Sequence, residues 1–312
     1  MTDEPMSAAT SLPAPGPHGG DGPHVAKALA LAPGELLDLS QNMNPFAPDV
    51  GVIAGRHMSA LAHYPDSAQA QVALAGVLGV AADRVIVTNG GSEAIHLVAV
   101  ARGGHPRSEP EFALHPRKPL GPIWRSNPHS PSGKLATDTE RADVWDEAFY
   151  PLTTGAWTAG RPGLVVGSLT KTFTCPGLRL GYVLLDAASD PAEFLARLPR
   201  WSANSLALAC LPQLLEQADL RLWADQLTAA KADLVSVLRG HHLRVEAAEA
   251  PWVLVKGGDL RTRLAPYAVL VRDCASFGMS DTYRIAVPDA AGLRRLRIAL
   301  ERAGIDGSTE GA

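Results

Sequence analysis

The segment Arg84–Val100 places the strongest constraint on what this chain can fold into. Its first part, Val85-Ile-Val-Thr88, is apolar or β-branched and predicts a buried strand. This strand runs into Asn89-Gly90-Gly91-Ser92-Glu93, which predicts a turn, and Ala94–Val100 continues as a helix. A strand, a glycine turn and a helix in this order direct backbone N–H groups toward an anion. The segment therefore predicts an α/β fold with an anion site at the end of one strand.

Similar apolar strands continue through the middle of the chain. Asp143–Ala148, Gly163–Ser168 and Leu180–Leu185 each predict a strand, and the stretch Gly103–Gly133 is proline-rich and predicts irregular structure. Strands separated by turns and helices favour a mostly parallel sheet that is covered on both faces. Near the N-terminus, Val25–Leu31 predicts a short helix.

The last third of the chain predicts a different arrangement. Its longest helix is expected over Pro212–Leu238, because proline is tolerated in a first turn. The apolar runs Trp252–Val255, Val269–Val271 and Tyr283–Val287 predict a second, small sheet, and Leu293–Ala303 predicts a closing helix. These elements favour a smaller α+β domain at the C-terminus.

Composition excludes several classes of protein. The net charge of −4 provides no basic surface for nucleic acid. We find no apolar run of the roughly 18 residues that a membrane helix needs, and no secretory signal. The three cysteines, Cys175, Cys210 and Cys274, lie far apart, which favours reduced thiols in a cytoplasmic protein over a disulfide framework or a metal site.

Lys171 is the strongest candidate for covalent chemistry. It follows the predicted strand Gly163–Ser168 among small residues, where desolvation favours the neutral amine that forms an imine with an aldehyde. Ser168 and Arg179 flank it and are placed to hold a phosphate. The alternative is a surface lysine in a turn, which strands on both sides disfavour.

Asp146 and the glycine turn add to this interpretation. An aspartate at a strand end can pair with a protonated pyridine nitrogen, although such an aspartate is more often a helix cap or a solvent contact. Gly91, Ser92 and Glu93 provide backbone donors and a hydroxyl at a helix N-terminus for a phosphate.

Two arginines adjoin apolar strand residues near the C-terminus. Arg272 and Arg284 are costly to bury without a counter-charge, so each is a candidate for binding a substrate carboxylate or phosphate. Salt bridges to Asp273 or Asp281 are an alternative of comparable weight for each residue taken alone.

Taken together, these segments resemble the fold-type I pyridoxal-phosphate enzymes. The resemblance rests on Ser168-Leu-Thr-Lys171 through Pro176-Gly-Leu-Arg179-Leu-Gly181, on Asp146-Glu-Ala-Phe149 and on Asn89–Glu93, and it runs from about Pro17 to Asp289. It implies pyridoxal 5'-phosphate as the cofactor, Lys171 as its Schiff-base lysine and Asp146 as the partner of its ring nitrogen. His63-Tyr64-Pro65 resembles the segment whose tyrosine reaches the cofactor phosphate of the neighbouring subunit, which implies a homodimer.

Within these enzymes, the chain is most similar to the L-threonine O-3-phosphate decarboxylases of cobalamin biosynthesis, relatives of the histidinol-phosphate aminotransferases. His18-Gly19-Gly20 and Ser40-Gln-Asn42-Met-Asn44-Pro45 resemble decarboxylase motifs, and Phe149 stands where aminotransferases usually have tyrosine. The resemblance implies an amino-phosphate substrate whose carboxylate and phosphate are held by His18, Gly19, Asn42, Arg272 and Arg284.

Two segments depart from the family pattern. Asn127-Pro-His-Ser130-Pro-Ser-Gly133 resembles the loop Asn-Pro-Asn-Asn-Pro-Thr-Gly, so Ser130 stands where an asparagine contacts the ring oxygen. Either a water bridges the gap or the electronics of the ring differ. Asn127 is the other asparagine of that loop. The stretch Gly103–Trp124 is shortened, and it leaves Phe112 and Arg107 nearest the position that stacks on the ring. These departures imply a remodelled site or weakened activity.

The resemblance implies decarboxylation of L-threonine O-3-phosphate to (R)-1-amino-2-propanol O-phosphate and carbon dioxide. The bond held perpendicular to the cofactor ring is the one that breaks, so the same residues also suit an aminotransferase that uses 2-oxoglutarate. A non-catalytic protein that binds the cofactor is a third alternative. The expected domains are an arm with a small-domain segment (1–50), a large cofactor-binding domain (51–200), and a connecting helix with the C-terminal small domain (201–312).

Overall fold

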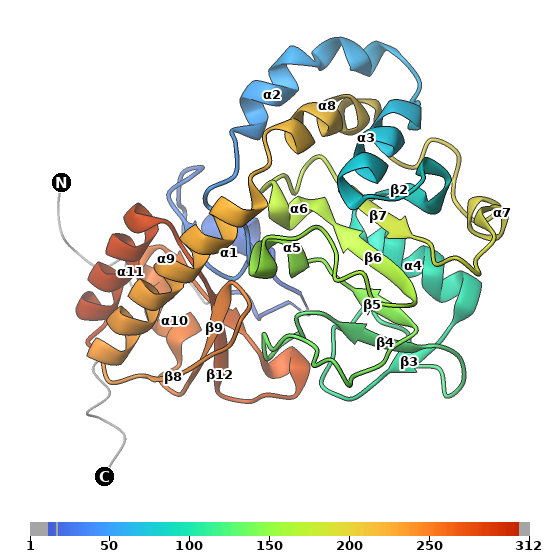
Figure 1. The fold of residues 1–312 in the computed structure, drawn as a ribbon. Helices are drawn as coiled ribbons and strands as arrows, with labels where there is room; N and C mark the ends of the chain where they lie inside the picture. Colours follow the sequence, from blue (N-terminus) through green and yellow to red (C-terminus); the bar gives the residue numbers. More distant parts are fainter. Residues whose placement is uncertain (1–11, 17, 306–312) are drawn as a thin grey trace. The chain divides into compact units, whose positions relative to one another are not determined.

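The computed structural model describes residues 12–16 and 18–305, which form two compact units (Figure 1). The large unit contains residues 46–130 and 134–226, and the small unit contains the residues up to Pro45, Pro131–Gly133 and those from Leu227 onward. The domain boundaries drawn from the sequence stay a prediction. Residues 1–11 and Pro17 of the predicted N-terminal arm lie outside the described residues.

A six-stranded sheet organises the large unit. Its strand order is β2-β7-β6-β5-β4-β3, where the bounds are β2 Val85–Asn89, β3 His105–Pro106, β4 Ile123–Ser126, β5 Val144–Asp146, β6 Leu164–Ser168 and β7 Leu180–Leu184. Strands β3 to β6 run parallel, and β7 pairs antiparallel with both β2 and β6. The predicted α/β fold is confirmed. The stretch Gly103–Gly133 was wrongly expected to be irregular throughout, because β3 and β4 extend the sheet there.

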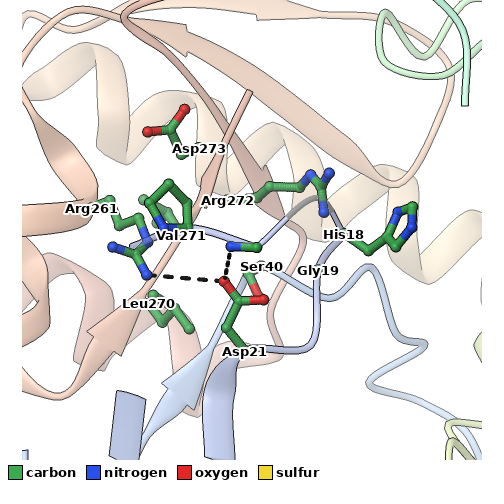
Figure 2. A pocket seen from close by; sticks show the side chains of 11 residues that line it. His18, Gly19, Asp21, Ser40, Arg261, Leu270, Val271, Arg272 and Asp273 are labelled. Carbon is green, nitrogen blue, oxygen red and sulfur yellow. Dashed lines mark hydrogen bonds and ion pairs between the residues drawn. The ribbon is translucent and has the colours of Figure 1, made fainter. Parts of the chain in front are cut away.

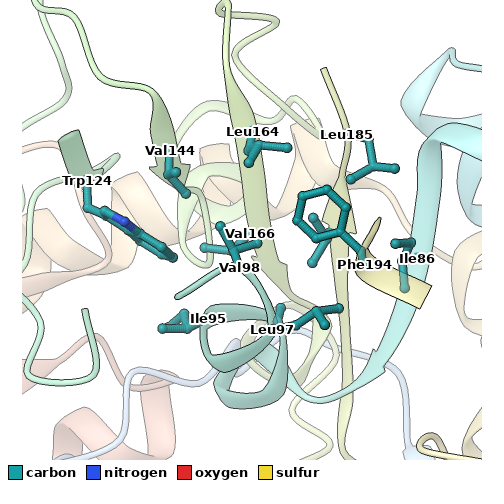
Figure 3. Packing of buried hydrophobic residues seen from close by; sticks show 12 residues of the cluster. Ile86, Ile95, Leu97, Val98, Trp124, Val144, Leu164, Val166, Leu185 and Phe194 are labelled. Carbon is teal, nitrogen blue, oxygen red and sulfur yellow. The ribbon is translucent and has the colours of Figure 1, made fainter. Parts of the chain in front are cut away.

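Alternating side chains of this sheet build the core of the large unit (Figure 3). Ile86 on β2 and Val166 on β6 face helix α4, Gly91–Arg102. Val183 on β7 belongs to the same cluster. The side chains between them point to the opposite face, because successive residues of a strand alternate. Helix α4 buries Ile95 and Val98 against the sheet, so the packing that forms the core also fixes the start of α4 at the end of β2.

The large unit contains further helices. Their bounds are α2 Val50–Arg56, η1 Met58–Ala62, α3 Ala68–Leu78, η2 Ala82–Arg84, α5 Tyr150–Thr154, α6 Leu169–Thr172, α7 Pro191–Leu195 and α8 Ser205–Glu216. The single helix expected over Pro212–Leu238 is wrong, since α8 ends at Glu216 and α9 spans Leu220–Gly240. Asp219 starts the second helix by accepting a hydrogen bond from the Leu222 N–H at 2.9 Å. Pro212 consequently lies inside α8.

The small unit contains a four-stranded antiparallel sheet. Its order is β11-β12-β9-β8, with β8 Arg244–Ala247, β9 Trp252–Lys256, β11 Arg272–Asp273 and β12 Thr282–Ala286. The run predicted over Val269–Val271 does not belong to this sheet: β10, Val269–Leu270, pairs parallel with β1, Leu37–Asp38. The helices of this unit are α1 Gly22–Ala28, the part of α9 from Leu227 onward, α10 Leu260–Leu264, η3 Ala265–Tyr267, η4 Ala275–Phe277 and α11 Ala290–Arg302. In the part of the chain that the structure describes, no helix has the length and apolar character to cross a membrane.

Candidate active site

Polar residues lie at the ends of neighbouring strands of the large unit, at one edge of the sheet. Ser126 pairs with Asp146 across β4 and β5, and Asp146 pairs with Val166 across β5 and β6. Because these strands run parallel, Asn127 after β4, Asp146 at the end of β5 and Lys171 after β6 lie at their shared carboxyl edge.

The glycine turn lies at the same edge. Asn89 pairs with Leu180 and Ser168 pairs with Gly181, so β2 and β6 end on either side of β7. A Cβ added at Gly181 would lie 2.3 Å from the carbonyl carbon of Gly90. Glycine is therefore required at position 181 for this close approach of β7 to the turn.

The turn, a hydroxyl and a guanidinium form a group that we call the glycine cradle: Gly90, Gly91, Ser168 and Arg179. A Cβ added at Gly91 would lie 2.8 Å from the Ser168 Cβ, and one added at Gly90 would lie 2.5 Å from Arg179 Nη2. Gly90 also has a φ of 81° and serves as the N-cap residue of α4 without a side-chain cap. Backbone donors at the start of a 12-residue helix, together with an arginine, suit a phosphate group.

Ser92 and Glu93 take different places in this turn. Ser92 is exposed in the first turn of α4. The Glu93 carboxylate accepts hydrogen bonds from the Asn89 N–H at 2.6 Å and from the Ser202 hydroxyl. In this arrangement Glu93 holds the conformation of the turn.

Lys171 lies on α6, the short helix that directly follows β6. Its side chain is half-buried, and the hydroxyl of the adjacent, buried Thr170 has no hydrogen-bond partner among the described residues. The neighbouring Cys175 is buried, which raises the pKa of its thiol to about 12. Cys175 is therefore protonated at neutral pH and is a poor nucleophile.

The structure pairs Asp146 with a histidine that the sequence interpretation missed. His115 Nε2 lies 3.1 Å from Asp146 Oδ2, and the other carboxylate oxygen, Oδ1, accepts a hydrogen bond from the Ala148 N–H at 3.0 Å. His115 is 3% exposed and Asp146 is 8% exposed, so solvent competes little for this contact. In the tautomer that carries hydrogen on Nε2, His115 donates a hydrogen bond to the Asp146 carboxylate and fixes its direction.

The shortened stretch that contains His115 is tied to β4 by Glu111. One Glu111 oxygen accepts a hydrogen bond from the Ser126 N–H at 3.0 Å, and the other accepts one from the Ser126 hydroxyl at 2.5 Å. Glu111 is 3% exposed. A proline-rich stretch without a helix is thereby held beside the strand that precedes Asn127. No local motif marks either Glu111 or His115, which explains why sequence reasoning missed both.

Glu147 forms a second buried acidic group next to Asp146. Its carboxylate accepts hydrogen bonds from the Ala159 N–H at 3.1 and 3.3 Å. Burial raises the pKa of Glu147 to about 7, and the negative charge of Asp146 acts in the same direction.

The remaining predicted residues of the large unit are placed as follows. Asn127 is buried, and its Oδ1 accepts a hydrogen bond from the Ala136 N–H at 2.9 Å, while Ser130 is buried in the same loop. Tyr64 is 78% exposed, and its ring stacks on that of Trp201 at 4.6 Å. Arg107 donates a hydrogen bond to the Arg141 carbonyl at 2.9 Å, and Phe112 packs on the core and edge-on to His115.

The small unit gathers the predicted substrate arginines. Arg272 and Arg284 are paired across β11 and β12, and the Phe277 ring lies 5.1 Å from the Arg272 guanidinium carbon and 5.8 Å from that of Arg284. Burial and the charge of Arg272 lower the pKa of Arg284 to about 9. Among the described residues, Arg284 Nε has no hydrogen-bond partner, while the Asp273 carboxylate accepts a hydrogen bond from the Ala275 N–H at 2.7 Å. An anion would offset the cost of burying these guanidinium groups.

The predicted residues of the N-terminal segment also belong to the small unit. Asn42 is 2% exposed, and neither atom of its side-chain amide has a hydrogen-bond partner among the described residues. Buried amides are normally satisfied, so Asn42 marks a place for a polar ligand. His18 and Gly19 line a pocket together with Arg272, and Figure 2 shows the Arg272 guanidinium directed toward His18.

Comparison with known proteins agrees with this geometry. A profile of the family described as Aminotransferase class I and II matches residues 117–300. The chain is 28% identical to the threonine-phosphate decarboxylase of Salmonella typhimurium, with 91% of this chain and 95% of that protein covered. It is 25% identical to histidinol-phosphate aminotransferase 1 of Thiobacillus denitrificans, with 84% of each chain covered. A histidinol-phosphate aminotransferase from Sinorhizobium meliloti, solved in complex with pyridoxal-5'-phosphate, shares the fold with a TM-score of 0.71 at 14% identity, covering 90% of this chain and 94% of that one.

Proposed function

Because the chain belongs to the aminotransferase class I and II family and its cofactor is therefore pyridoxal 5'-phosphate, we propose that it decarboxylates L-threonine O-3-phosphate to (R)-1-amino-2-propanol O-phosphate and carbon dioxide. The observation that carries this proposal is the set of cationic and unsatisfied groups in the small unit. Arg284 and Asn42 are buried with polar atoms that have no hydrogen-bond partner within residues 12–16 and 18–305, and Arg272 lies beside His18. A substrate with both a carboxylate and a phosphate would use all of these groups, whereas histidinol phosphate has no carboxylate.

The large unit fits the cofactor. The glycine cradle suits its phosphate, since the Gly91 N–H at the start of α4 lies next to Gly90, against which the Arg179 guanidinium packs. Lys171 would hold the cofactor covalently through its side-chain amine, and Asp146 would hold a proton on the ring nitrogen. His115 would keep Asp146 in place for that contact. When bound, pyridoxal 5'-phosphate withdraws electrons from the bond that breaks at the substrate α-carbon.

Each residue has a separate role in the proposed reaction. The arginines and Asn42 would orient the substrate so that its carboxylate, rather than its α-hydrogen, is the group that leaves. Lys171 would then return a proton to the α-carbon after carbon dioxide has left. Ser130, which is shorter than the asparagine of the family loop, would contact the cofactor's ring oxygen through a water.

A second candidate function is transamination with 2-oxoglutarate. It is supported by the relatives that are histidinol-phosphate aminotransferases, and the same arginines would bind the carboxylates of the keto acid. We further propose that the protein acts as a homodimer in which Tyr64 contacts the cofactor phosphate of the partner. The high exposure of Tyr64 supports this proposal.

The deciding experiment incubates the purified, cofactor-loaded protein with L-threonine O-3-phosphate in the absence of a keto acid. Equal amounts of carbon dioxide and aminopropanol phosphate would support the decarboxylase, and Lys171→Ala is the control that must form neither. No carbon dioxide, together with transfer of the amino group once 2-oxoglutarate is added, would overturn decarboxylation in favour of transamination. Bound cofactor without turnover in either assay would indicate a non-catalytic binding protein.

A further inference from the structure

One carboxylate ties together separate parts of the N-terminal segment. We call residues 12–16 and 18–21 the arm. Asp21 Oδ2 accepts a hydrogen bond from the Gly16 N–H at 2.9 Å and lies 3.9 Å from Arg261 Nη2 (Figure 2). The backbone carbonyl of Asp21 accepts a hydrogen bond from the Val25 N–H at 3.0 Å. Asp21 thus connects the arm, the helix α1 and the helix α10.

Arg261 is held in place by the packing of α10. Leu260 and Leu264, its neighbours on that short helix, are fully buried, and Arg261 itself is 6% exposed. Its Nη2 has no hydrogen-bond partner in the described part of the chain. The ion pair with Asp21 therefore offsets the cost of burying this end of the guanidinium group. Removing Asp21 would leave a buried guanidinium without this counter-charge.

The arm approaches the substrate residues so closely that glycine is required. A Cβ added at Gly19 would lie 2.6 Å from the Ser40 carbonyl oxygen and 3.4 Å from Arg272 Nη1. At the following position, Gly20 has a φ of 114°, which residues with a side chain rarely adopt. The position of the arm therefore decides how His18 and the backbone of Gly19 face Arg272.

The pKa of His18 is affected by the same carboxylate, that of Asp21. Burial lowers the pKa of His18, the positive charge of Arg272 lowers it further, and Asp21 opposes both effects. Asp273 also lines this pocket, and Arg261 faces it from the other side of Asp21. The Asp21 carboxylate is already the anion paired with Arg261. A substrate anion that enters this pocket would therefore interact with His18, Gly19 and Arg272.

We propose that Asp21 and Arg261 are positioning residues that hold His18 and Gly19 beside Arg272 and thereby set the affinity for the substrate phosphate. This inference rests on the proposed function for the identity of the substrate. Neither residue is expected to touch the reacting atoms. Their loss should therefore raise KM for L-threonine O-3-phosphate and leave kcat nearly unchanged.

The first test is a double-mutant cycle with Asp21→Asn, Arg261→Gln and the double variant. If the pair acts as a unit, each single variant raises KM about tenfold and the double variant raises it no further. Arg261→Lys should remain close to the original KM, because a contact at 3.9 Å to one oxygen needs charge rather than the planar fork of arginine. Asp289→Ala is the control, since it removes the Asp289 Oδ1 cap on α11, 2.6 Å from the Gly292 N–H, and so destabilises the small unit through a hydrogen bond that includes no arm residue.

The second test does not depend on turnover. Inorganic phosphate is titrated into the holoenzyme while the ring resonances of His18 are followed by NMR, with a His18→Gln variant for assignment. Asp21→Asn should weaken the phosphate response of His18 about tenfold, and Asp289→Ala should leave it unchanged. If the protein does not turn over phosphothreonine but this response behaves as stated, the proposed function fails and the positioning pair stands.

The positioning role is overturned by either of two results. One is a KM or phosphate affinity that changes no more in Asp21→Asn and Arg261→Gln than in the Asp289→Ala control. The other is a set of single effects that multiply in the double variant, because independent residues do not act as one unit.

Discussion

The contact between His115 and Asp146 supports the most specific prediction of this structure. His115→Leu removes the Nε2 donor that lies 3.1 Å from Asp146 Oδ2 and fills the space of the ring with an apolar side chain. A hydrogen bond to a charged acceptor is worth about 1.5–3 kcal/mol, which corresponds to roughly 10- to 150-fold in an equilibrium or a rate. This range applies to His115 because both side chains are buried, so bulk water does not replace the lost donor.

The matched variant is His115→Gln, whose Nε2 can occupy the position of the histidine donor. His115→Leu should weaken cofactor binding and lower kcat/KM by roughly 10- to 150-fold, while His115→Gln should keep most of both. The affinity for pyridoxal 5'-phosphate is measured by titration of the cofactor-free protein, and kcat/KM at saturating cofactor. Thermal unfolding of each cofactor-free variant separates a loss of stability from a loss of function. Equal losses in the leucine and glutamine variants, or no loss in either, would refute the role assigned to His115.

Further predictions concern the cofactor attachment, the glycine cradle and the buried acid. Lys171→Ala should abolish the covalent cofactor adduct that mass spectrometry detects after borohydride reduction; an adduct of unchanged yield would contradict the assignment. Gly181→Ala should weaken cofactor binding at least about tenfold, because the new Cβ would lie 2.3 Å from the Gly90 carbonyl carbon and 2.5 Å from the Gly91 nitrogen. Ala substitution at Gly177, where an added Cβ meets nothing within 4 Å, is its control. For Glu147, burial raises the pKa from its usual value of 4.5 to about 7, so the native state binds the proton more tightly than the unfolded state. The stability associated with this proton is present below pH 4.5 and is lost as the pH rises through 7, by about 3 kcal/mol. Glu147→Gln should remove most of that loss, as measured by urea unfolding at pH 5 and pH 8, and parallel pH profiles for the two proteins would show the argument to be wrong.

The sequence by itself determined the α/β fold and the cofactor, because both depend on local patterns. A buried strand followed by a glycine turn, and a lysine that follows another such strand, are readable from consecutive residues. The same is true of Asp146 at the end of its strand, which the structure places at the last position of β5. Helix lengths were less well determined, since the helix expected from Pro212 onward divides where Asp219 caps α9.

Tertiary structure alone decided which distant residues support the site. Glu111 and His115 lie in a proline-rich stretch without periodicity, and tertiary contacts such as that of Glu111 with Ser126 hold His115 beside Asp146, 31 positions away. Val269–Leu270 and Arg272–Asp273 are almost contiguous, yet one pairs with β1 and the other with β12. The pairing of Asp21 with Arg261 joins residues 240 positions apart in the same way. Such contacts depend on which buried groups pair with one another in the folded chain, and no short sequence pattern specifies these pairs.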